Sequence, residues 1–130
     1  MVIPDADSWI DLLNGHPAGD HLAKLVDEGQ AVVVGSALAE VLRGIAGEPE
    51  RQRVIGFLDR LDYAEMNRAV WIRAGEIASG LEAQGLRIPM SDIYIGALAL
   101  DGDHEVLTRD KHFERIPGLR LYDWKGDSDA

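Results

Sequence analysis

The sequence lacks cysteine and has no long apolar run. The absence of cysteine excludes a disulfide framework, a thiolate metal site and a cysteine nucleophile, and it favours a reducing compartment. No apolar stretch approaches the roughly 20 residues of a membrane-spanning helix. Pro4 and Asp5 interrupt the N-terminal apolar run too early for a signal peptide. We therefore expect a cytoplasmic protein that does not enter a membrane.

Basic residues are also scarce: 13 lysines and arginines stand against 23 aspartates and glutamates, which gives a formal charge of −10. Nucleic-acid phosphates are usually bound by basic patches, so this charge taken alone argues against a nucleic-acid-binding protein. A bound cation inverts the local electrostatics of an acidic site, which weakens the inference if part of the charge holds a metal. An acidic surface also suits a basic protein partner.

What the sequence does contain is ordinary for a globular domain, with 46% hydrophobic and 28% charged residues in a chain of 130. This length supports one hydrophobic core and is too short for two. We predict a single domain over residues 1–125. The polar residues 126–130 are expected to form a frayed tail.

Short apolar runs alternate with helical patterns along the chain. Strands are predicted at 2–3, 31–34, 62–66, 105–108 and 119–124, and helices at 9–13, 21–28, 37–45, 49–61, 68–84 and 92–100, with a helical turn at 113–116. The continuous run Ala31-Val32-Val33-Val34 is typical of a strand buried on both faces of a parallel sheet. The alternation predicts a three-layer α/β/α domain with a mainly parallel central sheet.

Acidic residues lie at the ends of these apolar elements or inside them, at Asp5, Glu40, Asp92 and Asp110. Glu40 falls in about the first turn of a helix for which Ser36 is the expected N-cap. Burying carboxylates is costly unless a cation neutralises them, and the ends of parallel strands are where α/β domains bind ligands. Hard oxygen ligands suit Mg²⁺ or Mn²⁺, whereas the lack of cysteine and the scattered histidines argue against zinc. The pattern suggests a divalent-metal site and phosphodiester chemistry.

Four segments carry a family resemblance. They are VIPDADSWIDLL (2–13), SALAEVLRG (36–44), IPMSDIYIGALA (88–99) and VLTRDKHFERIPGL (106–119). In this order and spacing the chain resembles the PIN-domain ribonucleases of the VapC toxin family over nearly its whole length. The resemblance implies that Asp5, Glu40, Asp92 and Asp110 hold Mg²⁺ or Mn²⁺, and that metal-activated water cleaves single-stranded RNA. It also implies a homodimer and an inhibitory VapB-like antitoxin.

Residues beside the acidic quartet have less certain roles. Thr108, Arg109 and Lys111 are predicted to contact the substrate, although a strand end and solvated charges explain them as well. Asp7 stands where the family more often has Ser or Thr, and we interpret it as a helix N-cap rather than an outer metal ligand. The four histidines show no ligand spacing and are expected at the surface. Trp9, Trp71 and Phe113 are expected in the core or an interface rather than in base stacking.

Ordinary structural explanations exist for each carboxylate. Asp5 and Asp92 are suited to cap helices, Glu40 to pair with Arg43 three residues later, and Asp110 to start a turn.

Two other functions also stay open. One is a haloacid dehalogenase-like phosphatase that uses Asp5 as nucleophile, Asp7 as acid/base and Asp101-Gly102-Asp103 as the late acidic pair. The other is a non-catalytic PIN-like binding module.

Overall fold

The computed structural model describes residues 1–123, so Trp124 and the predicted tail at 126–130 lie outside the described residues. The strands are short and pair in parallel: β1 (Val2–Pro4) with β4 (Glu105–Leu107), and β2 (Val32–Val34) with β3 (Asp62–Ala64). A bridge between Val2 and Ala31 joins the two pairs, which gives the order β3-β2-β1-β4. The predicted parallel sheet is confirmed, including its short third strand.

The last predicted strand, 119–124, is wrong as a regular strand. The described part of this segment pairs with β4 only through a bridge between Leu121 and Val106. The backbone N–H of Val106 donates to Arg120 O at 3.0 Å, and the Tyr122 N–H donates back to Val106 O at 2.8 Å. One residue pair at the sheet edge makes no ladder. Beside this bridge, the Arg120 side chain pairs with the Asp103 carboxylate at 2.9 Å.

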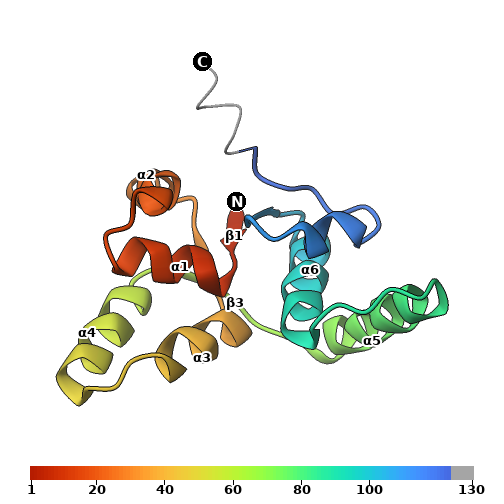
Figure 1. Ribbon diagram of the computed structural model, residues 1–130, viewed down its shortest axis with the longest axis horizontal. Helices are drawn as coiled ribbons and strands as arrows, with labels where there is room; N and C mark the ends of the chain where they lie inside the picture. Colours follow the sequence, from red (N-terminus) through yellow and green to blue (C-terminus); the bar gives the residue numbers. More distant parts are fainter. Residues whose placement is uncertain (124–130) are drawn as a thin grey trace.

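Helices cover the strands on both sides (Figure 1). The strands lie between the group α1 to α4 and the pair α5 and α6, which makes the three layers. The bounds are α1 (Ala6–Leu13), α2 (Asp20–Asp27), α3 (Gly35–Arg43), α4 (Glu48–Leu58), α5 (Arg68–Ala83) and α6 (Met90–Gly102), with 3₁₀ turns η1 (Pro17–Gly19) and η2 (Lys111–Arg115). Within residues 1–123, no helix has the length and hydropathy needed to cross a bilayer.

Two predicted N-caps are wrong. α3 begins at Gly35 directly after β2, with Val34 as its N-cap, so Ser36 lies inside the first turn and Glu40 in the second. No loop residue separates this strand from its helix, which leaves no position for a serine cap. In α1 the cap is Asp5 rather than Asp7, because the Ser8 N–H donates to Asp5 Oδ1 at 2.9 Å. Asp7 is exposed in the first helical turn.

Of the three aromatic residues expected in the core or an interface, two lie in the core. Trp9 and Phe113 are each 1% exposed, whereas Trp71 is 50% exposed. α5 buries the stripe of Val70, Ala74 and Leu81, and Trp71 follows Val70 about 100° around the helix. Trp71 therefore lies beside the buried stripe, where its ring packs edge-on against Tyr94 of α6 at 5.0 Å.

A glycine on α6 sets how closely the C-terminal segment approaches that helix. A Cβ atom at buried Gly96 would lie 2.7 Å from Cδ1 of Ile116, which is the C-cap of η2. Only a residue without a side chain permits this contact. Gly96 thus allows η2 to pack against α6, and η2 follows β4 at the end of the sheet.

Candidate metal centre

The register of β1 and β4 brings Asp5 and Thr108 together. Pro4 pairs with Leu107, and the Asp5 N–H donates to Leu107 O at 3.1 Å, so the next residues of the two parallel strands are neighbours. Both side chains are only 6% exposed, and they are the buried polar residues of the described chain. The Thr108 hydroxyl donates to Asp5 Oδ2 at 2.5 Å. A buried carboxylate at the carboxyl ends of parallel strands is thus held by a neighbouring strand.

Ser8 holds the other oxygen of the Asp5 carboxylate. Its N–H and its hydroxyl both donate to Asp5 Oδ1, at 2.9 and 2.6 Å. A carboxylate has about four acceptor positions, and these bonds with the Thr108 bond use three, which leaves one on Oδ2 for a cation. Sequence analysis missed Ser8, although a serine three residues after an N-cap aspartate is a recognisable capping pattern.

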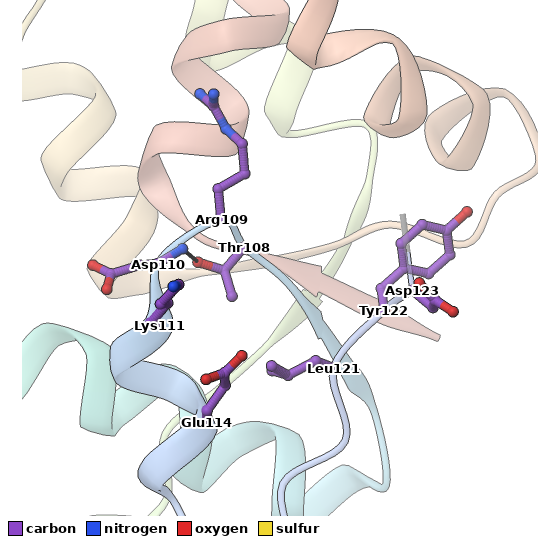
Figure 2. Close-up of a pocket in the computed structure, with 8 residues that line it drawn as sticks. All are labelled: Thr108, Arg109, Asp110, Lys111, Glu114, Leu121, Tyr122 and Asp123. Atoms are coloured by element: carbon purple, nitrogen blue, oxygen red, sulfur yellow. Dashed lines mark hydrogen bonds between the residues drawn. The ribbon is translucent and has the colours of Figure 1, made fainter. Parts of the chain in front are cut away.

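Thr108 also fixes the position of Asp110. Its hydroxyl oxygen accepts from the Asp110 N–H at 2.9 Å, the bond drawn in Figure 2. Asp110 is the N-cap of η2, and its Oδ1 accepts from the His112 N–H at 2.9 Å. One hydroxyl therefore links two of the predicted metal ligands. The predicted substrate contact of Thr108 stays a prediction.

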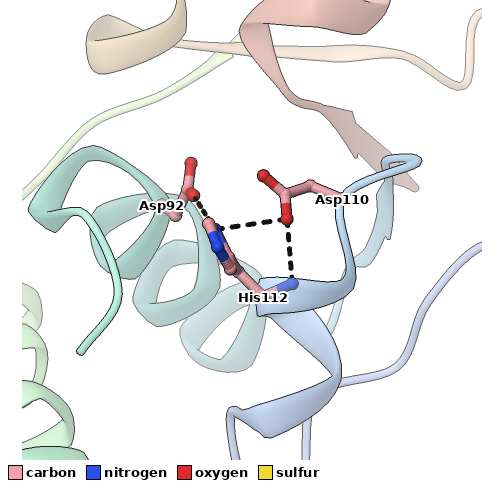
Figure 3. A group of neighbouring side chains, drawn as sticks. All are labelled: Asp92, Asp110 and His112. Atoms are coloured by element: carbon pink, nitrogen blue, oxygen red, sulfur yellow. Dashed lines mark hydrogen bonds and ion pairs between the residues drawn. The ribbon is translucent and has the colours of Figure 1, made fainter. Parts of the chain in front are cut away.

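Asp92 approaches Asp110 from the first turn of α6, and His112 lies between them (Figure 3). The Nδ1 atom of His112 is 3.2 Å from Asp110 Oδ1 and 3.5 Å from Asp92 Oδ2. One ligand atom from each of these residues lies within 4.8 Å of the others, a spacing that suits a single metal ion. Capping accounts for the position of Asp110, but it does not account for the convergence of two carboxylates on one imidazole.

The electrostatics of the two carboxylates agree with this geometry. Burial is the largest cause that raises the pKa of Asp5 above its ordinary value, and the bonds from Ser8 and Thr108 oppose it. Burial also raises the pKa of Asp92, and the charges of Asp110 and Asp5 add to the effect. Asp92 is therefore repelled by the other two carboxylates, and the hydrogen bond with His112 opposes this rise of its pKa. A divalent cation bound among them would relieve this repulsion.

Glu40 is the quartet member that the structure ties least closely to the others. It lies half-buried on α3, which packs against both α1 and α6. Within residues 1–123, Glu40 makes no ion pair with Arg43, so the ordinary explanation for this residue is not observed. Its place in the metal centre stays a prediction.

The expectation that the histidines take no part in a ligand group is wrong for His112. Its side chain is 40% exposed, and its ring contacts two of the predicted ligands. His104 is half-buried as well, and burial lowers its pKa. The signal for His112 was its position two residues after Asp110, because η2 folds that short interval into a turn.

Arg109 and Lys111, the other predicted substrate contacts, differ in their surroundings. Arg109 extends toward α1 in Figure 2 and pairs with Asp11, at 2.5 Å. Lys111 is exposed on η2 and lines a cavity of about 310 Å³ that borders Asp110. Glu114 and Asp123 line the same cavity, so its charge is mixed. Of the two cations, Lys111 makes no ion pair within the described residues.

The phosphatase alternative does not fit this geometry. Its acid/base, Asp7, is exposed on α1. Asp101 and Asp103 lie at the far end of α6 from Asp92, about 13–17 Å along a helix that rises 1.5 Å per residue. Asp101 and Asp103, the late acidic pair that the phosphatase reaction needs, therefore lie away from Asp92 and from the carboxylates near it.

Comparison with known proteins agrees with the cluster. A family model described as "PIN domain" matches residues 2–119. The chain belongs to the PIN domain family. This PIN domain is 27% identical over 127 residues to Ribonuclease VapC2 of Rickettsia felis, with 92% of this chain and 95% of that protein covered. It is 26% identical to the tRNA(fMet)-specific endonuclease VapC of Shigella flexneri, with the same shares covered.

Solved structures resemble this PIN domain as well. The DNA-bound VapBC structure from Salmonella typhimurium superposes with a TM-score of 0.81 at 26% identity, covering 95% of this chain and 97% of the other. VapBC2 of Rickettsia felis, bound to a promoter DNA fragment, gives a TM-score of 0.80 at 25% identity, covering 95% and 99%. The predicted fold class is confirmed, and so is the resemblance to the VapC family.

Proposed function

We propose that the protein is an endoribonuclease toxin of a toxin–antitoxin pair, and that it hydrolyses RNA phosphodiester bonds with Mg²⁺ or Mn²⁺ in the cytoplasm. The observation that carries this proposal is the cluster of Asp92, Asp110 and His112, whose ligand atoms lie within 4.8 Å of one another, and Thr108 links Asp110 to the buried Asp5 carboxylate. The whole-chain similarity to VapC ribonucleases supports the reaction class. Its cofactor class follows from the carboxylate donors, which suit a hard divalent cation.

The protein residues have separate tasks in this proposal. Asp5, Asp92 and Asp110, with Glu40, hold the cation, while Thr108 and Ser8 keep the Asp5 carboxylate in one orientation. A divalent cation held by these residues would supply Lewis-acid chemistry here, making a water molecule more acidic and offsetting negative charge on the scissile phosphate. Lys111 and Arg109 lie next to Asp110 in sequence and supply cations for the substrate phosphates. No covalent enzyme intermediate is needed.

A metal-ligand substitution tests this function. Asp92→Asn keeps the size and removes the charge, so RNA cleavage should fall at least about 100-fold, the upper range for changes around metal ligands. Asp101→Asn is the matched control, because Asp101 is an exposed aspartate at the other end of the same helix. Cleavage of a single-stranded RNA is measured with Mg²⁺, with Mn²⁺ and in EDTA. Full activity of Asp92→Asn, or of the wild type in EDTA, would reject the function.

The antitoxin partner follows from the family and from the charge. An arginine of a basic partner segment would bind the Asp92 and Asp110 carboxylates as a bidentate group and exclude the cation. The net charge of −10 favours such a segment. Inhibition by a VapB-like antitoxin should therefore weaken when its arginine is replaced and when Mg²⁺ is raised. Equal inhibition by an antitoxin without any basic residue near the centre would contradict this mechanism.

A homodimer completes the proposal. Tyr63, Trp71, Ile72 and Met90 are exposed large apolar side chains, and all but Tyr63 lie on the α5 and α6 layer. Large exposed apolar groups on one layer are typical of an interaction surface. The test compares the sedimentation of Ile72→Glu with that of the wild type, and the variant should sediment as a monomer. If it keeps the mass of a dimer, the dimer interface does not include this surface.

A further inference from the structure

The contacts of the His112 imidazole exceed what hydrogen bonding explains. Nδ1 faces two carboxylate oxygens, at 3.2 Å in Asp110 and 3.5 Å in Asp92. A ring nitrogen carries at most one hydrogen, so contact with both oxygens would need that hydrogen to be shared in a weaker three-centre bond. The distance to Asp92 is also longer than the usual range of about 2.7–3.2 Å for a nitrogen–oxygen hydrogen bond.

A shared cation explains both distances. Two donors bound to one ion at about 2.1 Å lie about 3.0 Å apart in octahedral geometry and about 3.4 Å apart in tetrahedral geometry. The two observed separations, 3.2 and 3.5 Å, are close to these values. The backbone supports this arrangement, because the His112 N–H is bound to Asp110 Oδ1 at 2.9 Å and fixes the ring relative to that carboxylate. Figure 3 shows the ring between the two carboxylates.

We propose that His112 is a nitrogen ligand of the metal centre and makes it prefer Mn²⁺ over Mg²⁺. This inference rests on the proposed metal-dependent function and concerns which cation the centre selects. Mg²⁺ is bound almost entirely through oxygen, whereas imidazole favours transition-metal ions. A centre of carboxylates alone has no nitrogen donor with which to distinguish the two ions. A centre with one imidazole among its carboxylates has such a nitrogen donor.

The test compares His112→Gln with the wild type and with His16→Gln, an exposed histidine that caps η1 and is not one of the clustered ligands. Because the His112 side chain is 40% exposed, its replacement opens no core cavity. Mn²⁺ and Mg²⁺ affinities are measured by calorimetry. His112→Gln should weaken Mn²⁺ about tenfold or more and change Mg²⁺ much less, whereas His16→Gln should change neither.

Pulsed electron paramagnetic resonance of bound Mn²⁺ gives a readout that does not depend on activity. The wild type and His16→Gln should show ¹⁴N couplings from imidazole, and His112→Gln should lose them. If the wild type shows no ¹⁴N coupling, or if His112→Gln retains it, His112 is not a ligand and the inference is overturned. The proposed function stands in that case as long as Asp92→Asn abolishes Mn²⁺ binding and RNA cleavage. If Asp92→Asn leaves both intact, the proposed function itself fails.

Discussion

The two halves of the metal centre are held in place by different means. At the strand ends, Asp5 is buried and three hydrogen bonds from Ser8 and Thr108 fix its carboxylate. On the helical side, Asp92 and Asp110 are half-buried on separate elements and meet only across His112. The first half is set by hydrogen bonds within the protein. The second half brings two carboxylates of like charge together, and a cation or a cationic group between them would neutralise that charge.

The largest loss of stability is expected in the strand-end half, when the Thr108 hydroxyl is removed. Thr108→Val has nearly the same shape but leaves Asp5 Oδ2 and the Asp110 N–H without their partner. We expect a loss of about 2–3 kcal/mol in the free energy of unfolding, typical of a lost bond to a charged buried group. The measurement is urea unfolding in EDTA.

Ser8→Ala is the graded comparison for Thr108→Val. It removes the hydroxyl bond to Asp5 Oδ1 but keeps the N–H bond to the same oxygen, so the loss should be nearer about 1 kcal/mol. Equal losses in the two variants, or none in Thr108→Val, would show that the strand-end carboxylate does not depend on Thr108.

The helical half should respond to pH and to cations. Because the pKa values of Asp5 and Asp92 are raised in the folded state, the folded protein without metal binds more protons than the unfolded chain between the ordinary and the raised values. The contribution of these groups to stability is therefore full below about pH 4 and is lost as pH rises through their folded pKa values. Mn²⁺ at 100 times its dissociation constant should add about 2.7 kcal/mol at neutral pH.

Thermal unfolding of the wild type and Asp92→Asn in EDTA, from pH 3.5 to 7.5, measures this effect. The variant should lose less stability across that range, because it lacks one of the two raised carboxylates. It should also gain little from Mn²⁺. If both proteins lost the same stability across this pH range, the pKa of Asp92 would not be raised in the folded protein.

The smallest effect is expected at Arg109, which lies between the two halves. Its ion pair with Asp11 is exposed on the arginine side, so Arg109→Ala should cost less than about 1 kcal/mol of stability. RNA affinity should fall more clearly, and more at low than at high salt, because a phosphate contact is screened by ions. Filter binding of RNA to the Asp92→Asn background, at two salt concentrations, measures this. Salt-independent affinity would remove Arg109 from the substrate surface.

The sequence predicted more of the strand-end half of the centre than of the helical half. Asp5 and Asp110 each close an apolar run, and the ends of parallel strands meet, so these two carboxylates were expected at one site. The hydrogen bonds that Ser8 and Thr108 donate to Asp5 were not predicted.

The contacts between elements could not be read in this way. His112 lies beside Asp92 because η2 folds back on α6, and no periodic pattern in the sequence encodes that packing. The N-cap errors at Ser36 and Asp7 have a related cause. α3 begins directly after β2 and has the last strand residue, Val34, as its N-cap, whereas α1 begins one residue after β1 and has that residue, Asp5, as its N-cap. In both helices the expected polar cap therefore lies inside the helix.

Gly96, an uncharged residue, affects the spacing of the carboxylates in the helical half. The distance between the Asp92 and Asp110 carboxylates depends on how near η2 lies to α6, and the contact of Gly96 with Ile116 limits that distance. A methyl group added at Gly96 would meet Cδ1 of Ile116 at 2.7 Å, so either the isoleucine side chain or η2 would have to shift. A shift of η2 would move Asp110 relative to Asp92, so the spacing of these carboxylates depends on the volume of an apolar contact as well as on charge.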